Sequence, residues 1–401
     1  MIFAQVPPSV LDCRRQTTPC PPGDTHMRII TKVLEIGEDY LQVIESLLEK
    51  EAPLADTLFL DIETTGLSPA QSRIYLIGCL YYESGAWHMI QWFDNTGTDE
   101  KLLLSSFLLF AEHYHVLVHY NGSRFDLPFL TSRMEALGLN GSLSSMNSMD
   151  LYKILQPYRN ILGLPDYKQQ TVEEYFGTGR TEEESGKDLI KVYQQYLGNP
   201  CRELLEPLSE HNEADLEGLL SLVPVFIYRH LPSMALTVRR AQADYYNDVN
   251  GNRKEEMILY FDTDLIVPAP LHANGDGCHL KIEGSTGVLK IPIHNGELKY
   301  FYANYKDYFY LPEEDTAIHK YIASYVDKDN KVPARPDNCY TRKTAFYLPQ
   351  WQMGGDLFRR PFFKKSYKDP DLFFEFTDDL KKDRNFLSDY AHHVYRHLLG
   401  V

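Results

Sequence analysis

Leu58-Phe59-Leu60-Asp61-Ile62-Glu63-Thr64-Thr65-Gly66 is the stretch that decides the fold of the first half of this 401-residue chain. Residues 57–61 form a short apolar run that predicts a buried β-strand. Because side chains alternate along a strand, Asp61 and Glu63 point to the same face. Acids spaced this way are common on solvated strand faces, but the apolar residues before Asp61 favour a partly buried pair. This pair is the first candidate for a functional site.

A further acid, Asp126, follows another predicted strand. That strand covers residues 116–120 and ends at Asn121-Gly122, and a helix is expected over residues 126–137. Aspartate is an ordinary residue at the start of a helix, so a structural N-cap explains this position on its own. Capping does not exclude a second role as a metal ligand.

Asp215 lies four residues after His211 in a predicted helix over residues 201–228. Side chains at i and i+4 share one face of a helix. Glu210 and Glu213 support the alternative that this face is merely solvated. Leucines give the helix an apolar side next to Asp215, and they are Leu216, Leu219, Leu220 and Leu222. Asp215 is therefore expected at the edge of the buried surface.

The order of the predicted elements indicates an α/β fold class. Two strands around Glu83-Ser84-Gly85 are expected to pair as an antiparallel hairpin. Strand, hairpin, helix, strand and helix is the order of an RNase H-like mixed sheet flanked by helices. The remaining predicted segments are the hairpin strands 73–82 and 87–93, the helix 99–113, the closing strand 149–152, and the helices 170–176 and 187–197.

Four acids brought into one site would repel one another. Two charges about 5 Å apart at an effective dielectric near 20 cost roughly 3 kcal/mol. A site that holds four such groups is hard to explain without cations. Hard divalent ions such as Mg²⁺ and Mn²⁺ prefer oxygen ligands.

The short sequence motifs around these acids resemble those of the DEDD exonuclease superfamily, which has the RNase H-like fold. Asp-Ile-Glu-Thr-Thr-Gly at 61–66 is similar to its first motif, Asn-Gly-x-x-Phe-Asp at 121–126 to its second, and His-Asn-x-x-Asp at 211–215 to its third. The resemblance covers about residues 54–231. Three further segments are similar to sequences of the YprB-type subgroup of predicted bacterial exonucleases. They are Val172-Glu173-Glu174-Tyr175-Phe176-Gly177, Ser185-Gly186-Lys187-Asp188 with Tyr193, and Leu204-Leu205-Glu206-Pro207-Leu208.

The resemblance implies a metal-dependent 3′→5′ exonuclease with a two-metal-ion mechanism on DNA or RNA ends. Two divalent cations, Mg²⁺ or Mn²⁺, would be held by Asp61, Glu63, Asp126 and Asp215. His211 would orient or deprotonate the attacking water, since histidine changes charge near neutral pH. Only three residues separate His211 from Asp215, which is the spacing of the tyrosine branch of the superfamily rather than of its histidine branch.

Several alternatives stay open at this point. A non-catalytic nucleic-acid-binding protein, a scaffold that recruits a protein partner, or an endonuclease would use the same fold, although the intact set of acids favours an enzyme. Asp150 is explained equally well as support behind the acids or as a helix cap. The predicted substrate contacts are Thr64, Asn121 and Phe125 near the acids, and Arg359 and Arg360 in the second half.

Bulk composition limits the class of protein. The net charge is −16, and residues 1–231 carry 17 Lys and Arg against 32 Asp and Glu, whereas residues 232–401 are nearly neutral. This balance argues against a tight, non-specific duplex binder. The six cysteines form no paired or zinc-binding spacing, which favours a reducing, cytoplasmic location. No apolar run of membrane-spanning length occurs, and no secretory signal opens the chain.

Three segments surround or follow the predicted nuclease domain, which covers residues 28–231. Residues 1–27 are expected to be a weakly structured extension, and Met27 is a candidate translation start. Residues 241–254 are polar and predict a linker. Residues 255–401 predict a β-rich module closed by a helix over 384–399.

Residues 342–368 interleave cations with aromatic rings, and only Asp356 opposes them. Rings stack on bases while cations follow phosphates, so this segment is a candidate guide for a single strand. The favoured alternative places the rings in a core and leaves the cations on a wetted surface.

Overall fold

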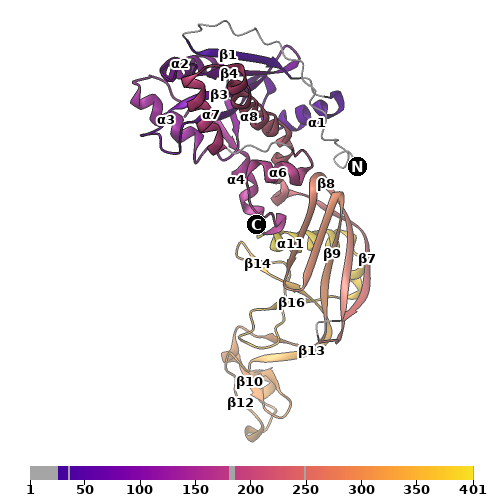
Figure 1. The fold of residues 1–401 in the computed structure, drawn as a ribbon. Coiled ribbons are helices and arrows are strands. Elements are labelled where there is room, and N and C mark those ends of the chain that lie inside the picture. Colours follow the sequence, from indigo (N-terminus) through magenta and orange to yellow (C-terminus); the bar gives the residue numbers. More distant parts are fainter. Residues whose placement is uncertain (1–25, 35–36, 180–185, 248–249, 401) are drawn as a thin grey trace. The chain divides into compact units, whose positions relative to one another are not determined.

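The computed structural model describes residues 26–34, 37–179, 186–247 and 250–400 (Figure 1). The chain divides into two compact units between His230 and Leu231. The predicted extension at 1–27 lies outside the described residues except for its last two. No helix within these described ranges is long and apolar enough to cross a membrane.

The first unit is built on a six-stranded mixed sheet of order β1-β4-β3-β2-β5-β6. Strands β1 to β4 pair antiparallel, while β2, β5 and β6 run parallel to one another. This is the RNase H-like sheet that the sequence predicts. The strands are β1 (Arg28–Val33), β2 (Thr57–Thr64), β3 (Ile74–Glu83), β4 (Ala86–Phe93), β5 (Val116–His119) and β6 (Asn147–Asp150).

The predicted hairpin between β3 and β4 is confirmed. Ser84 and Gly85 form its two-residue turn with φ values of 54° and 85°. Two successive left-handed residues match the right-handed twist of the flanking strands, and glycine takes such a conformation without a steric cost. The turn therefore fixes the register in which Glu83 faces Ala86.

Helices flank the sheet and bury two apolar clusters. Leu60 and Ile62 of β2 pack in one cluster with residues of α2 and α3. Tyr75 and Phe93 pack in the other with α7 and α8. The helices of this unit are α1 (Glu38–Leu48), α2 (Glu100–Ala111), α3 (Asp126–Ala136), α4 (Leu151–Leu155), α5 (Arg159–Leu162), α6 (Gln169–Phe176), α7 (Gly186–Gly198) and α8 (Arg202–Ser221).

The prediction of one helix over 201–228 was wrong at its C-terminal end. Helix α8 ends at Ser221, and the 3₁₀ segment η3 (Val223–Arg229) follows it. Pro224 has no N–H to donate to the α-helical ladder, so the hydrogen-bonding pattern changes there. The part of the helix that carries His211 and Asp215 is unaffected.

The second unit is β-rich, as predicted, and is organised around a five-stranded antiparallel sheet of order β16-β13-β9-β8-β7. Helix α11 (Arg384–Leu399) has the predicted bounds and packs on β7, β8 and β9. The strands are β7 (Leu236–Asn247), β8 (Arg253–Gly275), β9 (Cys278–Phe301), β13 (Tyr340–Gln350) and β16 (Leu372–Glu375).

Smaller elements complete this unit. A three-stranded sheet has the order β11-β10-β12, and a two-stranded ribbon pairs β14 with β15. These elements and the short helices are β10 (Tyr308–Leu311), β11 (Thr316–His319), α9 (Lys320–Ala323), β12 (Val332–Pro333), β14 (Gln352–Met353), β15 (Asp356–Leu357) and α10 (Asp378–Lys382).

The linker predicted at 241–254 was wrong. Most of this segment belongs to the antiparallel pair of β7 and β8, in which Tyr246 faces Lys254. The side chains of this part of β7 are mostly exposed. The polar residues therefore belong to an exposed edge strand and not to a connection between domains. Backbone hydrogen bonds hold this strand in the sheet.

Candidate metal centre

The end of β2 presents Asp61 and Glu63 toward α8. Leu60 and Ile62 pack in the opposite apolar cluster, so alternation turns the two acids to the other face. Both acids are only partly exposed. A register shift between Glu63 and Thr64 ends the regular pairing with β3 directly after them.

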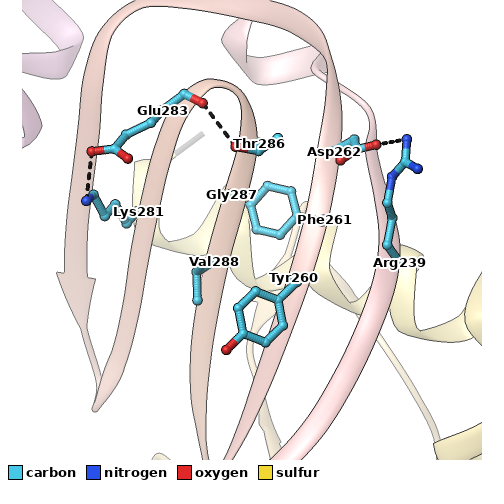
Figure 2. Close-up of a pocket in the computed structure, with 9 residues that line it drawn as sticks. All are labelled: Arg239, Tyr260, Phe261, Asp262, Lys281, Glu283, Thr286, Gly287 and Val288. Atoms are coloured by element: carbon cyan, nitrogen blue, oxygen red, sulfur yellow. Dashed lines mark hydrogen bonds and ion pairs between the residues drawn. The ribbon is translucent and has the colours of Figure 1, made fainter.

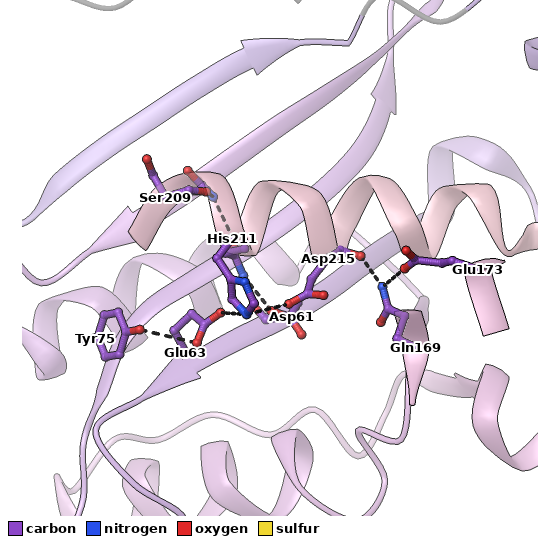
Figure 3. A network of polar contacts seen from close by, with 10 residues as sticks. Asp61, Glu63, Tyr75, Gln169, Glu173, Ser209, His211 and Asp215 are labelled. Carbon is purple, nitrogen blue, oxygen red and sulfur yellow. Dashed lines mark hydrogen bonds and ion pairs between the residues drawn. The ribbon is translucent and has the colours of Figure 1, made fainter. Parts of the chain in front are cut away.

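Helix α8 brings His211 and Asp215 to the same place (Figure 3). His211 Nε2 lies 3.4 Å from Asp215 Oδ2 and 3.8 Å from Glu63 Oε1. One ligand atom from each of these three residues lies within 4.8 Å of the others. Their side chains are 12–18% exposed, so the group borders solvent from a largely buried position.

Asp126 approaches from the start of α3. Phe125 occupies the N-cap position, so Asp126 is the first residue of the helix rather than its cap. Its carboxylate lies within electrostatic reach of the backbone of Ile62, which stands between the first two acids. The Asp126 side chain is buried. The charges of Asp61 and Asp126 interact, which places these two groups in one electrostatic cluster.

Burial and mutual repulsion raise the pKa values of these acids. Burial, followed by the charges of Asp215, Glu63 and Asp126, raises the pKa of Asp61 well above its usual value. Burial raises the pKa of Glu63 to about 8, although His211 opposes the shift. Burial, with the charges of Asp150 and Asp215, raises the pKa of Asp126 to about 7. Without a cation, ionisation of Asp61, Glu63 and Asp126 is thus disfavoured.

The donor set fits a hard divalent cation. Carboxylate oxygens with one imidazole are ligands that such ions accept. A bound cation would replace the protons and remove the repulsion that raises the pKa values. The structure brings all five predicted residues of the site into one electrostatic group, with Glu63, His211 and Asp215 closest together.

Supporting side chains that the sequence did not predict surround the acids. Tyr75 Oη donates to Glu63 Oε2 over 3.4 Å. Gln169 Nε2 donates to the carbonyl oxygen of Asp215 over 2.7 Å. Asn212 Nδ2 donates to Asp61 Oδ2 over 2.8 Å. Only Asn212 had a sequence signal, because it stands beside His211 in the third motif.

Asp150 fulfils both roles that the sequence left open. It caps α4 by accepting from the N–H groups of Tyr152 and Lys153. It also accepts from the N–H of Asn121 at 2.9 Å and that of Ser123 at 3.2 Å. Asp150 therefore fixes the turn that precedes Asp126.

The predicted substrate contacts near the acids lie at the end of β2 and in the segment that precedes α3. Thr64 Oγ1 donates to the carbonyl oxygen of Gly66 and shapes the turn after β2. Asn121 has a left-handed backbone with φ of 56°. Phe125 packs against the core cluster, and its ring centroid lies 5.5 Å from that of Phe129.

In the segment 342–368, the structure agrees in part with the alternative that the rings pack in a core while the cations lie on the solvated surface. Tyr347 and Phe363 are buried in a small core of the second unit. Arg359 and Arg360 are exposed, and the guanidinium of Arg359 lies 5.3 Å from the centroid of the Phe386 ring. The cations with acidic partners pair as Arg342 with Glu297 and Asp315, Lys343 with Glu375, and Lys365 with Asp371.

The second unit also contains a hollow of about 230 Å³ on its main sheet (Figure 2). Two ion pairs border it, Arg239 with Asp262 and Lys281 with Glu283. Each cation at its rim is thus matched by an acid. The hollow is lined by Arg239, Tyr260, Phe261, Asp262, Lys281, Glu283, Thr286, Gly287 and Val288.

Comparisons with known proteins agree with the fold of the first unit. Residues 58–226 match the family model of the RNase_H superfamily, and these residues contain α3, α8 and all of β2 except Thr57. No curated protein matches the chain. The YprB-type subgroup is therefore a resemblance of motifs alone.

Solved structures are similar over parts of both chains. The family B DNA polymerase of the archaeon Pyrobaculum calidifontis is 15% identical over 63% of this chain and 35% of its own, with a TM-score of 0.35. Exonuclease I is 14% identical over 51% of this chain and 54% of its own, with a TM-score of 0.29. The zinc-bound complex of Escherichia coli exonuclease I with single-stranded DNA is 14% identical over 51% and 54%, with a TM-score of 0.24.

Proposed function

We propose that this chain is a metal-dependent nuclease that hydrolyses phosphodiester bonds, acting as a 3′→5′ exonuclease on single-stranded or frayed ends of DNA or RNA. The observation that carries the proposal is the convergence of buried acids with raised pKa values around His211, within a domain that matches the RNase_H superfamily. Direction of attack and preference for ends rest on the three DEDD-like motifs.

Asp61, Glu63, Asp126 and Asp215 would hold two divalent cations, Mg²⁺ or Mn²⁺. When bound, such cations supply positive charge that polarises the scissile phosphate and makes the attacking water more acidic. Without that charge, ionisation of Asp61, Glu63 and Asp126 is disfavoured, because burial and repulsion raise their pKa values. A scaffold would gain nothing from this arrangement.

His211 is proposed to accept the proton of the attacking water at Nε2. Asp215 Oδ2 at 3.4 Å and Glu63 Oε1 at 3.8 Å would stabilise the imidazolium that forms. The same distances also suit His211 as an additional metal ligand. The two roles differ in what a substitution removes, since a general base affects turnover whereas a ligand affects cation affinity.

Strand contacts are proposed for residues in the turns beside the acids. Thr64 is the last residue of β2, and Asn121 and Phe125 precede α3, so each lies in or beside an element that carries an acid. Their backbone positions are fixed by the contacts of Thr64 with Gly66 and of Asn121 with Asp150. A strand end bound between these turns would reach the acids.

The proposal is tested by incubating the purified chain with 5′-labelled single strands of DNA and RNA, in Mn²⁺, Mg²⁺ or EDTA, beside an Asp215→Asn variant. We expect a ladder of shortened products that requires the metal and Asp215. Binding of the strands without turnover would instead support a non-catalytic nucleic-acid-binding protein. Equal digestion by the variant would reject the proposed site.

A further inference from the structure

We propose that Asn212 is a positioning residue that fixes the orientation of the Asp61 carboxylate, and that Gln91 in turn sets the orientation of the Asn212 amide. The inference rests on the proposed function in that Asp61 is taken as a cation ligand. It assigns no direct contact with substrate to either amide. The two amides are joined to Asp61 and to Ser209, both labelled in Figure 3, by hydrogen bonds.

The sheet register places the participants in one row. Asp61 on β2 faces Gly78 on β3, and Gly78 faces Gln91 on β4. Residues aligned across neighbouring strands point to the same face of the sheet. Helix α8 covers this row and places Asn212 over it, with the side chain fully buried.

The hydrogen bonds form a directed chain. Gln91 Nε2 donates to the carbonyl oxygen of Ser209 and to Asn212 Oδ1, both over 2.9 Å. Asn212 Nδ2 then donates to Asp61 Oδ2 over 2.8 Å and approaches the carbonyl oxygen of Asp61 at 3.4 Å. The chain runs from a backbone carbonyl of α8 to a carboxylate on β2.

Only one orientation of the two side-chain amides allows all of these hydrogen bonds to form. A carbonyl oxygen can only accept, so Gln91 must turn its NH₂ group toward Ser209. The same NH₂ group then requires the oxygen of Asn212, which leaves the NH₂ group of Asn212 for Asp61. A reversed Asn212 would set its oxygen against the carboxylate. The orientation of Asp61 is thus determined by the backbone of α8.

The hydrogen-bonded amides have room because residue 78, on β3, is a glycine without a side chain. A Cβ atom at Gly78 would lie 1.9 Å from Asn212 Oδ1 and 2.7 Å from Leu216 Cδ1. Such distances are far inside van der Waals contact, so any other residue at 78 would displace the amide. Glycine here permits the close approach of α8 to β3.

The two amides also lower the stability of the fold, which an apolar pair in the same place would not do. Among the described residues, no hydrogen-bond partner faces the buried oxygen Gln91 Oε1. A buried polar atom without a partner destabilises the fold, and an apolar pair of similar shape would not. Retaining two amides is explained if their directed hydrogen bonds are needed to hold Asp61.

Two substitutions of similar shape test the inference in the 401-residue chain. Asn212→Leu removes the donor to Asp61, and Gln91→Met removes the group that orients Asn212. Mn²⁺ affinity is measured by isothermal titration calorimetry, and unfolding is followed by circular dichroism. We expect each variant to weaken Mn²⁺ binding by roughly 10- to 100-fold, the range found for residues that support metal ligands. Turnover on a labelled strand should fall similarly, while the KM for that strand changes little.

The matched control is Leu104→Ala, a fully buried position on α2. It should lower the unfolding temperature but leave Mn²⁺ affinity unchanged, which separates positioning from general destabilisation. Should Asn212→Leu fail to fold, Gln91→Met alone decides the matter. Folded variants with native Mn²⁺ affinity would overturn the inference. A native chain that binds Mn²⁺ but cleaves no nucleic acid would reject the proposed function and leave the affinity comparison valid.

Discussion

The acid cluster of the first unit and the cation-rich segment 342–368 of the second unit differ in how their charges are compensated. The acids share one largely buried place, where three of them have raised pKa values. The cations Arg342, Lys343 and Lys365 are exposed, and each has an acidic partner. Exposed pairs contribute about 0–1 kcal/mol, whereas crowded buried charges cost several times more. Crowding of acids in a largely buried place, rather than local richness in charge, therefore distinguishes the candidate metal centre from the segment 342–368.

The largest expected effect comes from removing one of the crowded acids. Asp61→Asn keeps the shape but removes a charge from the site, so hydrolysis of a labelled strand should fall on the order of 1,000-fold. The same change relieves repulsion, and the metal-free protein should unfold at a higher temperature. Activity assays and thermal unfolding in EDTA check both outcomes. A variant with lower activity and also lower metal-free stability would contradict the idea of mutual repulsion.

His211→Gln should have the next largest effect. If His211 Nε2 accepts the proton of the attacking water, turnover should fall about 100-fold, which is the lower end of the usual contribution of a general base. Mn²⁺ affinity should change much less. Parallel turnover and calorimetry measurements decide between roles, because a large loss of Mn²⁺ affinity would identify His211 as a ligand instead.

The pH dependence of stability sharpens the comparison further. Glu63 and Asp126 have pKa values raised to about 8 and about 7 in the folded chain, so the folded state binds protons more tightly than the unfolded state. Their contribution is present at low pH and is lost as pH rises through these values. In EDTA, the free energy of unfolding should fall by about 1 kcal/mol or more between pH 5 and 8.

Saturating Mn²⁺ should remove most of that pH dependence, since the cation takes the place of the protons. Denaturant titrations at several pH values, with and without Mn²⁺, measure both effects. Stability in EDTA that rises over this interval would show that the acids are not crowded in the folded chain.

The smallest effect is expected in the second unit. Reversing the charges of Arg359 and Arg360, both exposed, should change the free energy of unfolding by no more than about 0.5 kcal/mol. Affinity for a fluorescent single strand should also stay near its native value. A salt-dependent loss of affinity, measured by fluorescence anisotropy, would break the comparison and establish this segment as a guide for nucleic acid.

Local patterns were sufficient to predict the elements that carry the site. Alternation placed Asp61 and Glu63 on one face, and helical spacing placed His211 with Asp215. The terminal helix over 384–399 was also predicted with the bounds that the structure shows. By contrast, the role of the polar residues 241–254 was not readable, because an exposed edge strand and a linker have the same composition.

The supporting network could not be predicted from spacing alone. Gln91 reaches the site only because the register of three strands aligns it with Gly78 and Asp61. Tyr75 reaches Glu63 across the same sheet. Pairings of this kind depend on turn geometry and tertiary packing. A single sequence does not reveal which residues these will bring face to face.

The most direct test of the account is the position of bound Mn²⁺ in crystals, located by its anomalous scattering. We predict strong peaks coordinated by carboxylate oxygens of Asp61, Glu63, Asp126 and Asp215. Crystals equilibrated with Mn²⁺ that show no peak among these residues, or peaks only elsewhere, would contradict the assignment of a metal centre.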